Sequence, residues 1–273
     1  MKERNITFIG AGNMAQAIII GLLDNGYPAK FITVCAPSST HRDVLAERYG
    51  VQSSNDNLRS VRNSDVVVLA VKPELFTQVC NQLCGEIDFS GKLVLSIAAG
   101  VTVRRLYALL GADIAILRVI PNTPCLVRQG MSGLYAPPKT SEQDKIFTEE
   151  LMSSVGKVCW LEHEGDINGI IAASGSAPAY FFLFMEAMQQ QTEALGFDKT
   201  TARTLVLQGV VGAAALASDA GNVSFSTLRK NVTSKGGTTS AALKVFEQQE
   251  VPRIIISAMQ AAVARAEEME RLF

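Results

Sequence analysis

The chain has 273 residues, 48% of them hydrophobic and 19% charged, a composition typical of a folded globular protein. Its net charge of −1 at pH 7 predicts no basic face, so we expect neither nucleic acid nor a membrane as a partner. The five cysteines are too irregularly spaced for a disulfide framework, and with only two histidines they predict no metal site. Met1–Asn5 lead into a strand-like segment without the apolar stretch of a signal peptide, so we expect a cytoplasmic protein.

The first part of the chain alternates between short apolar runs and helical patterns. The predicted strands, several of them apolar on both faces, are Ile6–Ile9, Phe31–Cys35, Val66–Val71, Leu93–Ile97, Ala115–Val119, Ser132–Tyr135 and Lys157–Leu161. The predicted helices between them are Met14–Asp24, Val44–Tyr49, Leu75–Leu83, Val103–Leu110 and Glu142–Ser154. This alternation predicts an α/β fold over residues 1–161, a Rossmann-like doubly wound sheet that binds a dinucleotide.

After Leu161 the strand-like runs end and long helical patterns follow. The predicted helices are Ile167–Ala173, Ala179–Leu195, Thr201–Ser218, Ser240–Gln248 and Pro252–Leu272, which make residues 162–273 an all-α domain. The apolar run Leu205–Ala217 is shorter than the ~20 residues of a membrane span, so we interpret it as part of a buried helix. Because the Thr201–Ser218 helix is apolar nearly all round, we expect a second subunit to help cover it.

A glycine-rich loop follows the first strand and opens the first helix. Its sequence is Ile9-Gly10-Ala11-Gly12-Asn13-Met14-Ala15, a G-x-G-x-x-A pattern. Gly10 allows the tight turn, Gly12 leaves room for a pyrophosphate, and Ala15 keeps the helix close to the sheet. The alternative is a tight β–α turn in a domain that binds no nucleotide. The order of strand, loop and helix favours dinucleotide binding.

The end of the second strand bears on which dinucleotide binds. The strand ends Val34-Cys35-Ala36-Pro37 without the acid that usually holds the ribose of NAD, and Ser38 to Arg42 follow. Hydroxyls and a base suit a 2′-phosphate, so the sequence predicts NADPH, with NADH as a poorer alternative. The alternative is that Ser38 belongs to an ordinary capped helix start and that Arg42 is solvated surface.

Other loops follow the carboxyl ends of strands, where ligands bind in this architecture. Ala70–Pro73, Ser96–Thr102 and Pro121–Pro124 hold small residues and prolines that suit a flat nicotinamide ring, although turn chemistry alone explains any one of them. In the helical part, glycines and threonines of Asn231–Thr239 precede a helix. They expose backbone N–H groups for a carboxylate, or they form a plain linker with a threonine cap.

Over essentially its whole length the sequence closely resembles the pyrroline-5-carboxylate reductase family. The stretches that carry the resemblance are Phe8–Met14, Ala70–Pro73, Ala98–Val101, Pro121–Pro124, Ser174–Tyr180 and Leu228–Glu247. The family reduces the imine of Δ1-pyrroline-5-carboxylate with NAD(P)H, by hydride transfer to the imine carbon, in the last step of proline biosynthesis. The resemblance therefore implies an NADPH-dependent oxidoreductase acting on a small-molecule substrate.

The resemblance also implies roles for particular residues. Ser38 and Asn57 would face the 2′-phosphate and ribose. The remaining cofactor positions would be Ile9, Gly10, Ala11, Gly12, Asn13, Met14, Ala70, Val71, Lys72, Pro73, Ala98, Ala99 and Asn231. The substrate positions would be Glu164, Ser234, Gly237, Thr238 and Thr239, with Thr239 as the catalytic hydroxyl at the ring nitrogen. The substrate would lie between the nucleotide domain of one subunit and the helical domain of a partner, in a homodimer formed through the helical domain; members often build decamers.

Some features depart from the family or suggest rivals. Lys235 stands where the family often has proline, and it could attract the carboxylate or point to solvent. A β-hydroxyacid dehydrogenase would need a buried base, whereas the lysines of the helical part lie at helix ends or in loops, and we interpret His163 as a surface residue. A non-catalytic NADP-binding regulator is the other alternative, against which the intact Gly236–Thr239 segment argues.

Overall fold

The computed structural model describes residues 1–273, which form two compact units. The first unit comprises Met1–Ser176 together with Ala261–Phe273, and the second comprises Ala177–Gln260. These units reflect packing, so the division into functional domains at residues 161 and 162 stays a prediction. Each unit is described by itself below.

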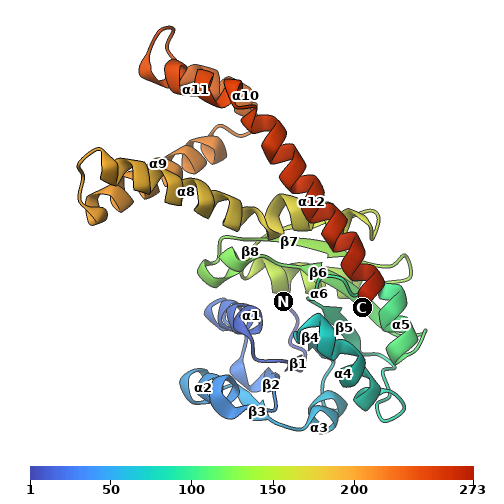
Figure 1. The fold of residues 1–273 in the computed structure, drawn as a ribbon. Coiled ribbons are helices and arrows are strands. Elements are labelled where there is room, and N and C mark those ends of the chain that lie inside the picture. Colours follow the sequence, from blue (N-terminus) through green and yellow to red (C-terminus); the bar gives the residue numbers. More distant parts are fainter. The chain divides into compact units, whose positions relative to one another are not determined.

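The first unit is built on an eight-stranded sheet in the order β3-β2-β1-β4-β5-β6-β7-β8 (Figure 1). The strands are β1 (Ile6–Ile9), β2 (Ile32–Cys35), β3 (Gln52–Ser54), β4 (Val66–Leu69), β5 (Leu93–Ser96), β6 (Ala115–Ile120), β7 (Gly130–Tyr135) and β8 (Gly156–Trp160). The strands from β3 to β6 run parallel, β7 is antiparallel to β6, and β8 is parallel to β7. The order 3-2-1-4-5-6 confirms the predicted Rossmann-like sheet.

Helices surround this sheet. They are α1 (Asn13–Asp24), α2 (Ser39–Tyr49), α3 (Asn57–Arg62), α4 (Phe76–Leu83), α5 (Val103–Leu110), α6 (Glu142–Ser153) and α7 (Asp166–Ile170). A π-helical turn at Ile171–Gly175 continues α7, and short 3-10 turns occur at Ala29–Phe31, Pro73–Leu75 and Thr123–Val127. The end of α12 (Val251–Leu272) also belongs to this unit.

The central strands bury both faces, and their alternation separates two cores. Val66 and Val68 of β4 pack in one core with side chains of α1 and α6, whereas Val67 and Leu69 pack in the other with side chains of α4 and α5. Successive side chains of a strand point to opposite faces, so both faces of β4 must be apolar and covered. The apolar runs in the sequence therefore correctly predicted strands that are covered on both faces.

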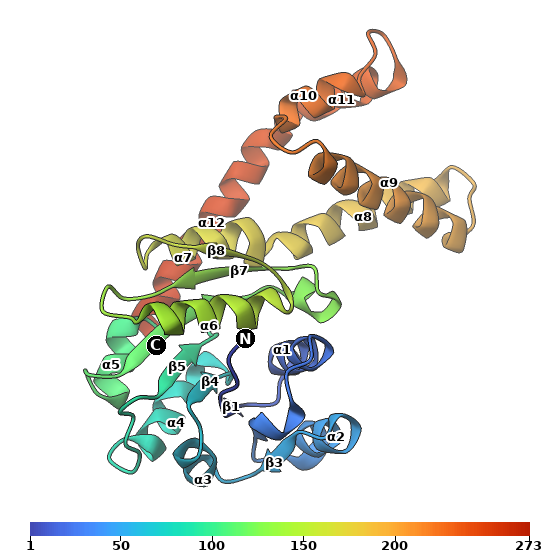
Figure 2. The same cartoon turned by 180° about the vertical axis from the view of Figure 1, so that it is seen from behind.

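The second unit contains only helices. They are α8 (Ala177–Ala194), α9 (Lys199–Asp219), α10 (Phe225–Asn231), α11 (Thr238–Gln248) and the first part of α12. Helices α8 and α9 lie side by side, as the two opposite views show (Figures 1 and 2). The Asp198 carboxylate caps α9 by accepting from the N–H groups of Thr200 and Thr201. These helices confirm the predicted all-α second part.

Helix α9 is much less buried in a single chain than its composition led us to expect. Only Ala202 and Val206 are buried along it, whereas Leu205, Val211 and Leu216 are at least half exposed. The expectation of a buried helix is therefore wrong for one chain alone. Two helical stretches, 166–194 and 199–219, are long and apolar enough to cross a membrane, but such a pair is weak evidence for a membrane span because core helices of soluble proteins share that length and composition.

Three elements escaped the sequence analysis. Strand β3 (Gln52–Ser54) is polar and lies at the sheet edge, so it carries no apolar signal. Helices α3 and α10 are short, and each begins at a capping side chain, Asp56 for α3 and Ser224 for α10. Their detectable signal is thus the cap and not an apolar period.

Candidate active site

The glycine-rich loop joins β1 to α1 beside the end of β4. Gly10 has a φ of +111°, and a Cβ added there would lie 2.4 Å from the carbonyl oxygen of Ala70. Only glycine therefore lets the two strand ends approach so closely. At Gly12, by contrast, a Cβ would meet no atom within 4 Å, so this residue faces open space. The tight turn predicted at Gly10 is therefore present, and the open space at Gly12 leaves the room that a pyrophosphate would need.

The amino end of α1 presents unused donors to that space. The first helical bond runs from Gln16 N–H to Gly12 O at 3.0 Å, which leaves the N–H groups of Asn13, Met14 and Ala15 without helical acceptors. No acidic residue occupies the first turn. The side chain of Ala15 is buried against the first core. This end of α1 therefore suits the pyrophosphate of a dinucleotide.

The end of β2 is held by a small polar network. The buried thiol of Cys35 stands where an NAD site usually has an acid, and it donates to Asn57 Oδ1 at 3.1 Å. Arg42 donates from Nη1 to Ala36 O at 2.6 Å and from Nε to Asp43 Oδ1 at 2.8 Å. Arg42 is thus fixed beside the strand end and is not plain solvated surface. Its hydrogen bond lowers the pKa of the Asp43 carboxyl.

The predicted capped helix start at Ser38 is also present. Ser38 is the N-cap of α2, and its Oγ accepts from Thr40 N–H at 3.3 Å, a long contact. The side chain of Ser38 is exposed, so capping does not remove it from solvent. Capping and contact with a ligand are compatible roles for this hydroxyl.

The predicted cofactor loops after β4 and β5 lie at the same carboxyl edge. Ala70 directly follows β4 and abuts Gly10, and Pro73 opens a short 3-10 turn. After β5, Ala98 is buried and Ala99 is half-buried, whereas Lys72 in the neighbouring loop is exposed. The structure therefore brings the Gly10, Ala70 and Ala98 loops, with Ser38 and Asn57, to the carboxyl edge of one sheet.

A charged cluster lies behind the β5–α5 loop; Glu164 of this cluster was named from the sequence, but Arg118 and Glu270 were missed. The Arg118 side chain is fully buried, and its Nη1 pairs with Glu164 Oε1 at 2.8 Å and with Glu270 Oε1 at 3.2 Å. Glu164 Oε1 also accepts from Val103 N–H at 2.7 Å. A lone charge inside the apolar strand β6 is the signal that could have found this cluster.

The same cluster shapes the chemistry of its neighbours. Burial raises the pKa of the Tyr107 and Tyr135 phenols, and the negative charge of Glu164 adds to the effect in both. Both phenols therefore stay protonated through neutral pH. Elsewhere, no group of three or more His, Cys, Asp or Glu side chains is placed to hold a metal.

The Pro121–Pro124 loop is fastened through Asn122. Its Nδ2 donates to Ser174 O at 3.0 Å, and its Oδ1 accepts from Met131 N–H at 2.8 Å. Ser174 lies in the π-helical turn after α7, and such turns often occur at functional sites. Both amide atoms of Asn122 are thus occupied within the chain, so the loop is more than a simple turn.

The predicted substrate segment lies in the second unit, between α10 and α11. Asn231 ends α10, and Gly237 is the N-cap of α11 without any side-chain cap bond. The first helical bond runs from Ala241 N–H to Gly237 O at 3.1 Å, so the N–H groups of residues 238–240 lack helical acceptors. Thr239 sits inside the first turn, is exposed, and its hydroxyl bonds to nothing in the chain. It is therefore not the helix cap.

Comparisons with known proteins agree on one family. Residues 164–269 match a family model described as pyrroline-5-carboxylate reductase dimerisation. Residues 5–100 match another, described as NADP oxidoreductase coenzyme F420-dependent. A pyrroline-5-carboxylate reductase of Vibrio alginolyticus is 54% identical over 273 residues, which is 100% of both chains.

The chain belongs to the pyrroline-5-carboxylate reductase family. Solved structures agree with this membership. A pyrroline-5-carboxylate reductase from Coxiella burnetii has 44% identity and a TM-score of 0.92, over 98% of this chain and 99% of that one. A pyrroline carboxylate reductase from Plasmodium falciparum with NADP bound has 26% identity and a TM-score of 0.88, over 99% of both chains. The resemblance inferred from the motifs is thus confirmed.

The contrast between Gly10 and Gly12 gives a paired prediction. Gly12→Ala should leave the melting temperature of the ligand-free protein unchanged, because its Cβ enters open space, but it should weaken NADPH binding roughly tenfold or more. Gly10→Ala should instead lower the unfolding free energy by about 1–3 kcal/mol, because of its positive φ and the Ala70 carbonyl. Differential scanning fluorimetry and NADPH titration check both. Equal melting temperatures for the two variants would contradict the assignment.

Proposed function

We propose that this chain catalyses the NADPH-dependent reduction of Δ1-pyrroline-5-carboxylate to L-proline, the last step of proline biosynthesis. The observation that carries the proposal is the open amino end of α11, with free N–H groups and an unbonded Thr239 hydroxyl, in a chain of this family. Such a helix end binds a small carboxylate without an arginine. The glycine-rich loop of the same chain would bind NADPH, the hydride donor that the reduction of an imine requires.

The residues at the carboxyl edge of the sheet fit an NADPH molecule. The open space at Gly12 and the free N–H groups of α1 suit the pyrophosphate. Ser38, Asn57 and the fixed Arg42 surround a strand end without an acid, which suits a 2′-phosphate. The remaining proposed contacts at this edge are Ile9, Gly10, Ala11, Asn13, Met14, Ala70, Val71, Lys72, Pro73, Ala98 and Ala99. Asn231, which ends α10 in the second unit, is a further proposed contact. A bound NADPH supplies the hydride.

The proposed substrate contacts are Glu164, Ser234, Gly237, Thr238 and Thr239. The N–H groups of α11 would bind the carboxylate, and the Thr239 hydroxyl would contact the ring nitrogen. Glu164 uses Oε1 for Val103 and Arg118, which leaves Oε2 without a bond in the chain. Lys235 is exposed and adds positive charge near this segment. The contribution of a partner subunit to the site stays a prediction.

This chemistry needs no strong acid from the protein. A pyrrolinium forms in water, and its carbon is electrophilic, so the side chains have to bind, orient and exclude water. His41 and His163 are both exposed. The lysines of the second unit, Lys199, Lys230, Lys235 and Lys244, are exposed as well, which weighs against a hydroxyacid dehydrogenase with a buried lysine base.

A direct assay tests the proposed function. The unaltered chain is incubated with NADPH and pyrroline-5-carboxylate, nucleotide oxidation is followed optically, and L-proline is quantified. Stoichiometric proline formation is the expected result. A non-catalytic NADP-binding regulator would bind the nucleotide without turnover, and a hydroxyacid dehydrogenase would act only on hydroxyacids.

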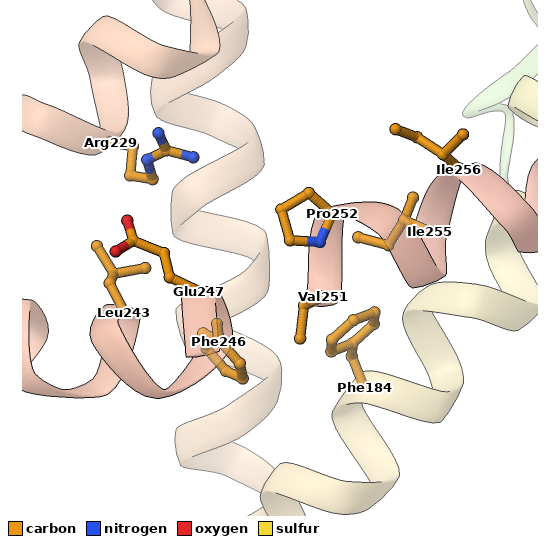
Figure 3. Close-up of a pocket in the computed structure, with 9 residues that line it drawn as sticks. All are labelled: Phe184, Arg229, Leu243, Phe246, Glu247, Val251, Pro252, Ile255 and Ile256. Atoms are coloured by element: carbon orange, nitrogen blue, oxygen red, sulfur yellow. The ribbon is translucent and has the colours of Figure 1, made fainter. Parts of the chain in front are cut away.

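We also propose a homodimer formed through the second unit. Large apolar side chains, including Phe181, Phe182 and Leu216, are exposed on its surface. Exposure of such an apolar surface to water is unfavourable. A pocket between α8, α10, α11 and α12 is open as well (Figure 3). It is lined by Phe184, Phe246, Ile255 and Ile256, with Arg229 and Glu247 at one side. The match of residues 164–269 to a family model described as dimerisation supports a second copy of this chain as the occupant.

Larger assembly and location belong to the same proposal. The family resemblance supports the assembly of dimers into a decamer. The five unpaired thiols support a cytoplasmic location, since disulfides are rare in that compartment. Dimerisation also accounts for the two apolar helical stretches without a membrane.

The first prediction from this proposal concerns cofactor choice. The kcat/KM for NADPH should exceed that for NADH, because no acid at the end of β2 repels a 2′-phosphate and Arg42 lies beside it. Steady-state rates with each nucleotide at saturating substrate measure the ratio. A ratio at or below unity would refute the assignment of this loop.

Thr239→Ala should lower kcat/KM for pyrroline-5-carboxylate while leaving the NADPH dissociation constant nearly unchanged. A lost hydrogen bond to a charged partner costs about 1.5–3 kcal/mol, or roughly a tenfold to hundredfold drop in rate. Ser141→Ala is the matched control, because Ser141 caps α6 by accepting from Asp144 N–H at 3.1 Å. The control should lose about 1 kcal/mol of stability and keep its kinetics. Normal kinetics in Thr239→Ala would remove this residue from the site.

Dimerisation should depend on the apolar surface of α9. Val211→Glu should abolish the dimer, because it places a charge on an exposed apolar face that the partner covers. Val44→Glu, on the equally exposed surface of α2 in the first unit, should leave the dimer intact. Light scattering across a dilution series measures both. A monomer formed by the unaltered chain at all concentrations would contradict the proposal.

A further inference from the structure

Arg118 is the largest fully buried side chain, and the proposed reaction does not use it. It lies on β6, next to Ser96 of β5 and Tyr135 of β7 in the strand register. Two carboxylates contact its Nη1, whereas Nε and Nη2 are buried without any partner. A buried charge with unused donors destabilises a fold relative to an apolar side chain of similar size. Stability alone therefore does not explain why an arginine stands here.

One of the two carboxylates connects Arg118 to the cofactor loop. Glu164 Oε1 accepts from Arg118 Nη1 at 2.8 Å and from Val103 N–H at 2.7 Å. Val103 is the first residue of α5 and directly follows the Ala98–Thr102 loop. The carboxylate is favourable at this helix end, where it satisfies a free N–H group. Glu164 thus fixes the carboxyl end of the loop, and Arg118 fixes Glu164.

The other carboxylate comes from the last turn of α12, which lies against the same loop. Gly100 has a φ of +79°, and a Cβ there would be 3.0 Å from Met269 Cβ. Arg105 Nε donates to Phe273 O at 2.8 Å, and Glu270 in the same turn contacts Arg118 at 3.2 Å. The loop therefore rests on α12 on one side and is tied to Glu164 on the other, and Arg118 joins both.

We propose that Arg118 is a positioning residue for the cofactor loop. It holds Glu164 and Glu270 together, and through Glu164 it sets the position of Ala98 and Ala99. The inference rests on the proposed function in one respect, namely that this loop lines NADPH. A loop displaced by about 1 Å near reacting groups can lower rates by orders of magnitude, so a remote arginine can act on turnover without touching a ligand.

A double-mutant cycle tests this connection. The variants are Arg118→Met, Glu164→Gln and the double variant, each measured for NADPH dissociation constant, kcat/KM and hydrogen–deuterium exchange of residues 98–106. Each single variant should raise the dissociation constant roughly tenfold, because a charge-assisted bond that holds the loop is lost. The double variant should be within about twofold of the worse single variant, since both break one connection. Exchange in 98–106 should rise in all three.

Two further variants separate positioning from general loss of structure. Arg4→Met removes the Arg4–Asp144 ion pair of 2.6 Å before β1, at the opposite edge of the sheet, and should lower the melting temperature without changing NADPH affinity or exchange in 98–106. Arg118→Lys should restore part of the affinity, because it returns the charge with fewer donors. If Arg118→Met does not fold, Arg118→Lys and Glu270→Gln take its place in the cycle.

The outcomes distinguish this inference from the proposed function. Multiplicative losses in the double variant, or unchanged exchange in 98–106, overturn the positioning role. An unaltered chain that binds NADPH but does not reduce pyrroline-5-carboxylate counts against the proposed function only. If the unaltered chain binds no NADPH, the proposed function is overturned. The positioning role is then decided only by the hydrogen–deuterium exchange of residues 98–106 in the variants.

Discussion

The burial of both faces of the central strands is the constraint on which the first unit depends. Alternate residues of β4 enter separate cores, so helices must pack on each side of the sheet and the loops gather at its edges. Successive strands are added on one side of the sheet from β1 to β3 and on the other side from β4 onward, so the order reverses between β1 and β4. Gly10 and Ala70, which follow these two strands, are in contact at this point. A crevice at such a turning point binds ligands in open α/β sheets. The place of the dinucleotide site therefore follows from how the core is covered.

Polar groups at the same edge are held by tertiary contacts and not by neighbours in sequence. Asn122 joins β7 to the turn after α7, and Arg118 joins two carboxylates from distant segments. In a low-dielectric interior each such bond is strong, and each missing partner is costly. At this edge of the sheet, buried polar groups thus connect distant segments, which suits the proposed reaction because that reaction depends on orientation.

The second unit has the opposite character. Its helices are well capped but leave Phe181, Leu205 and Val211 exposed, because a few helices alone cannot surround so much apolar surface. A partner copy would complete its core, and stability would then depend on protomer concentration. The same unit carries the free amino end of α11. The proposed dimer interface and the proposed carboxylate site at α11 therefore both lie in this small helical unit.

The sequence by itself determined the succession of most strands and helices, the glycine loop, the all-α second part and the family, because these follow from local periodicity and short motifs. It did not reveal β3, α3 or α10, whose signals are polar or consist of a single cap. Nor did it show that Arg42 is tied to Ala36, that Asn122 reaches Ser174, or that Glu270 lies beside Arg118. The last two contacts join residues 52 and 152 positions apart, and only the packing of β6 against distant helices brings such groups together.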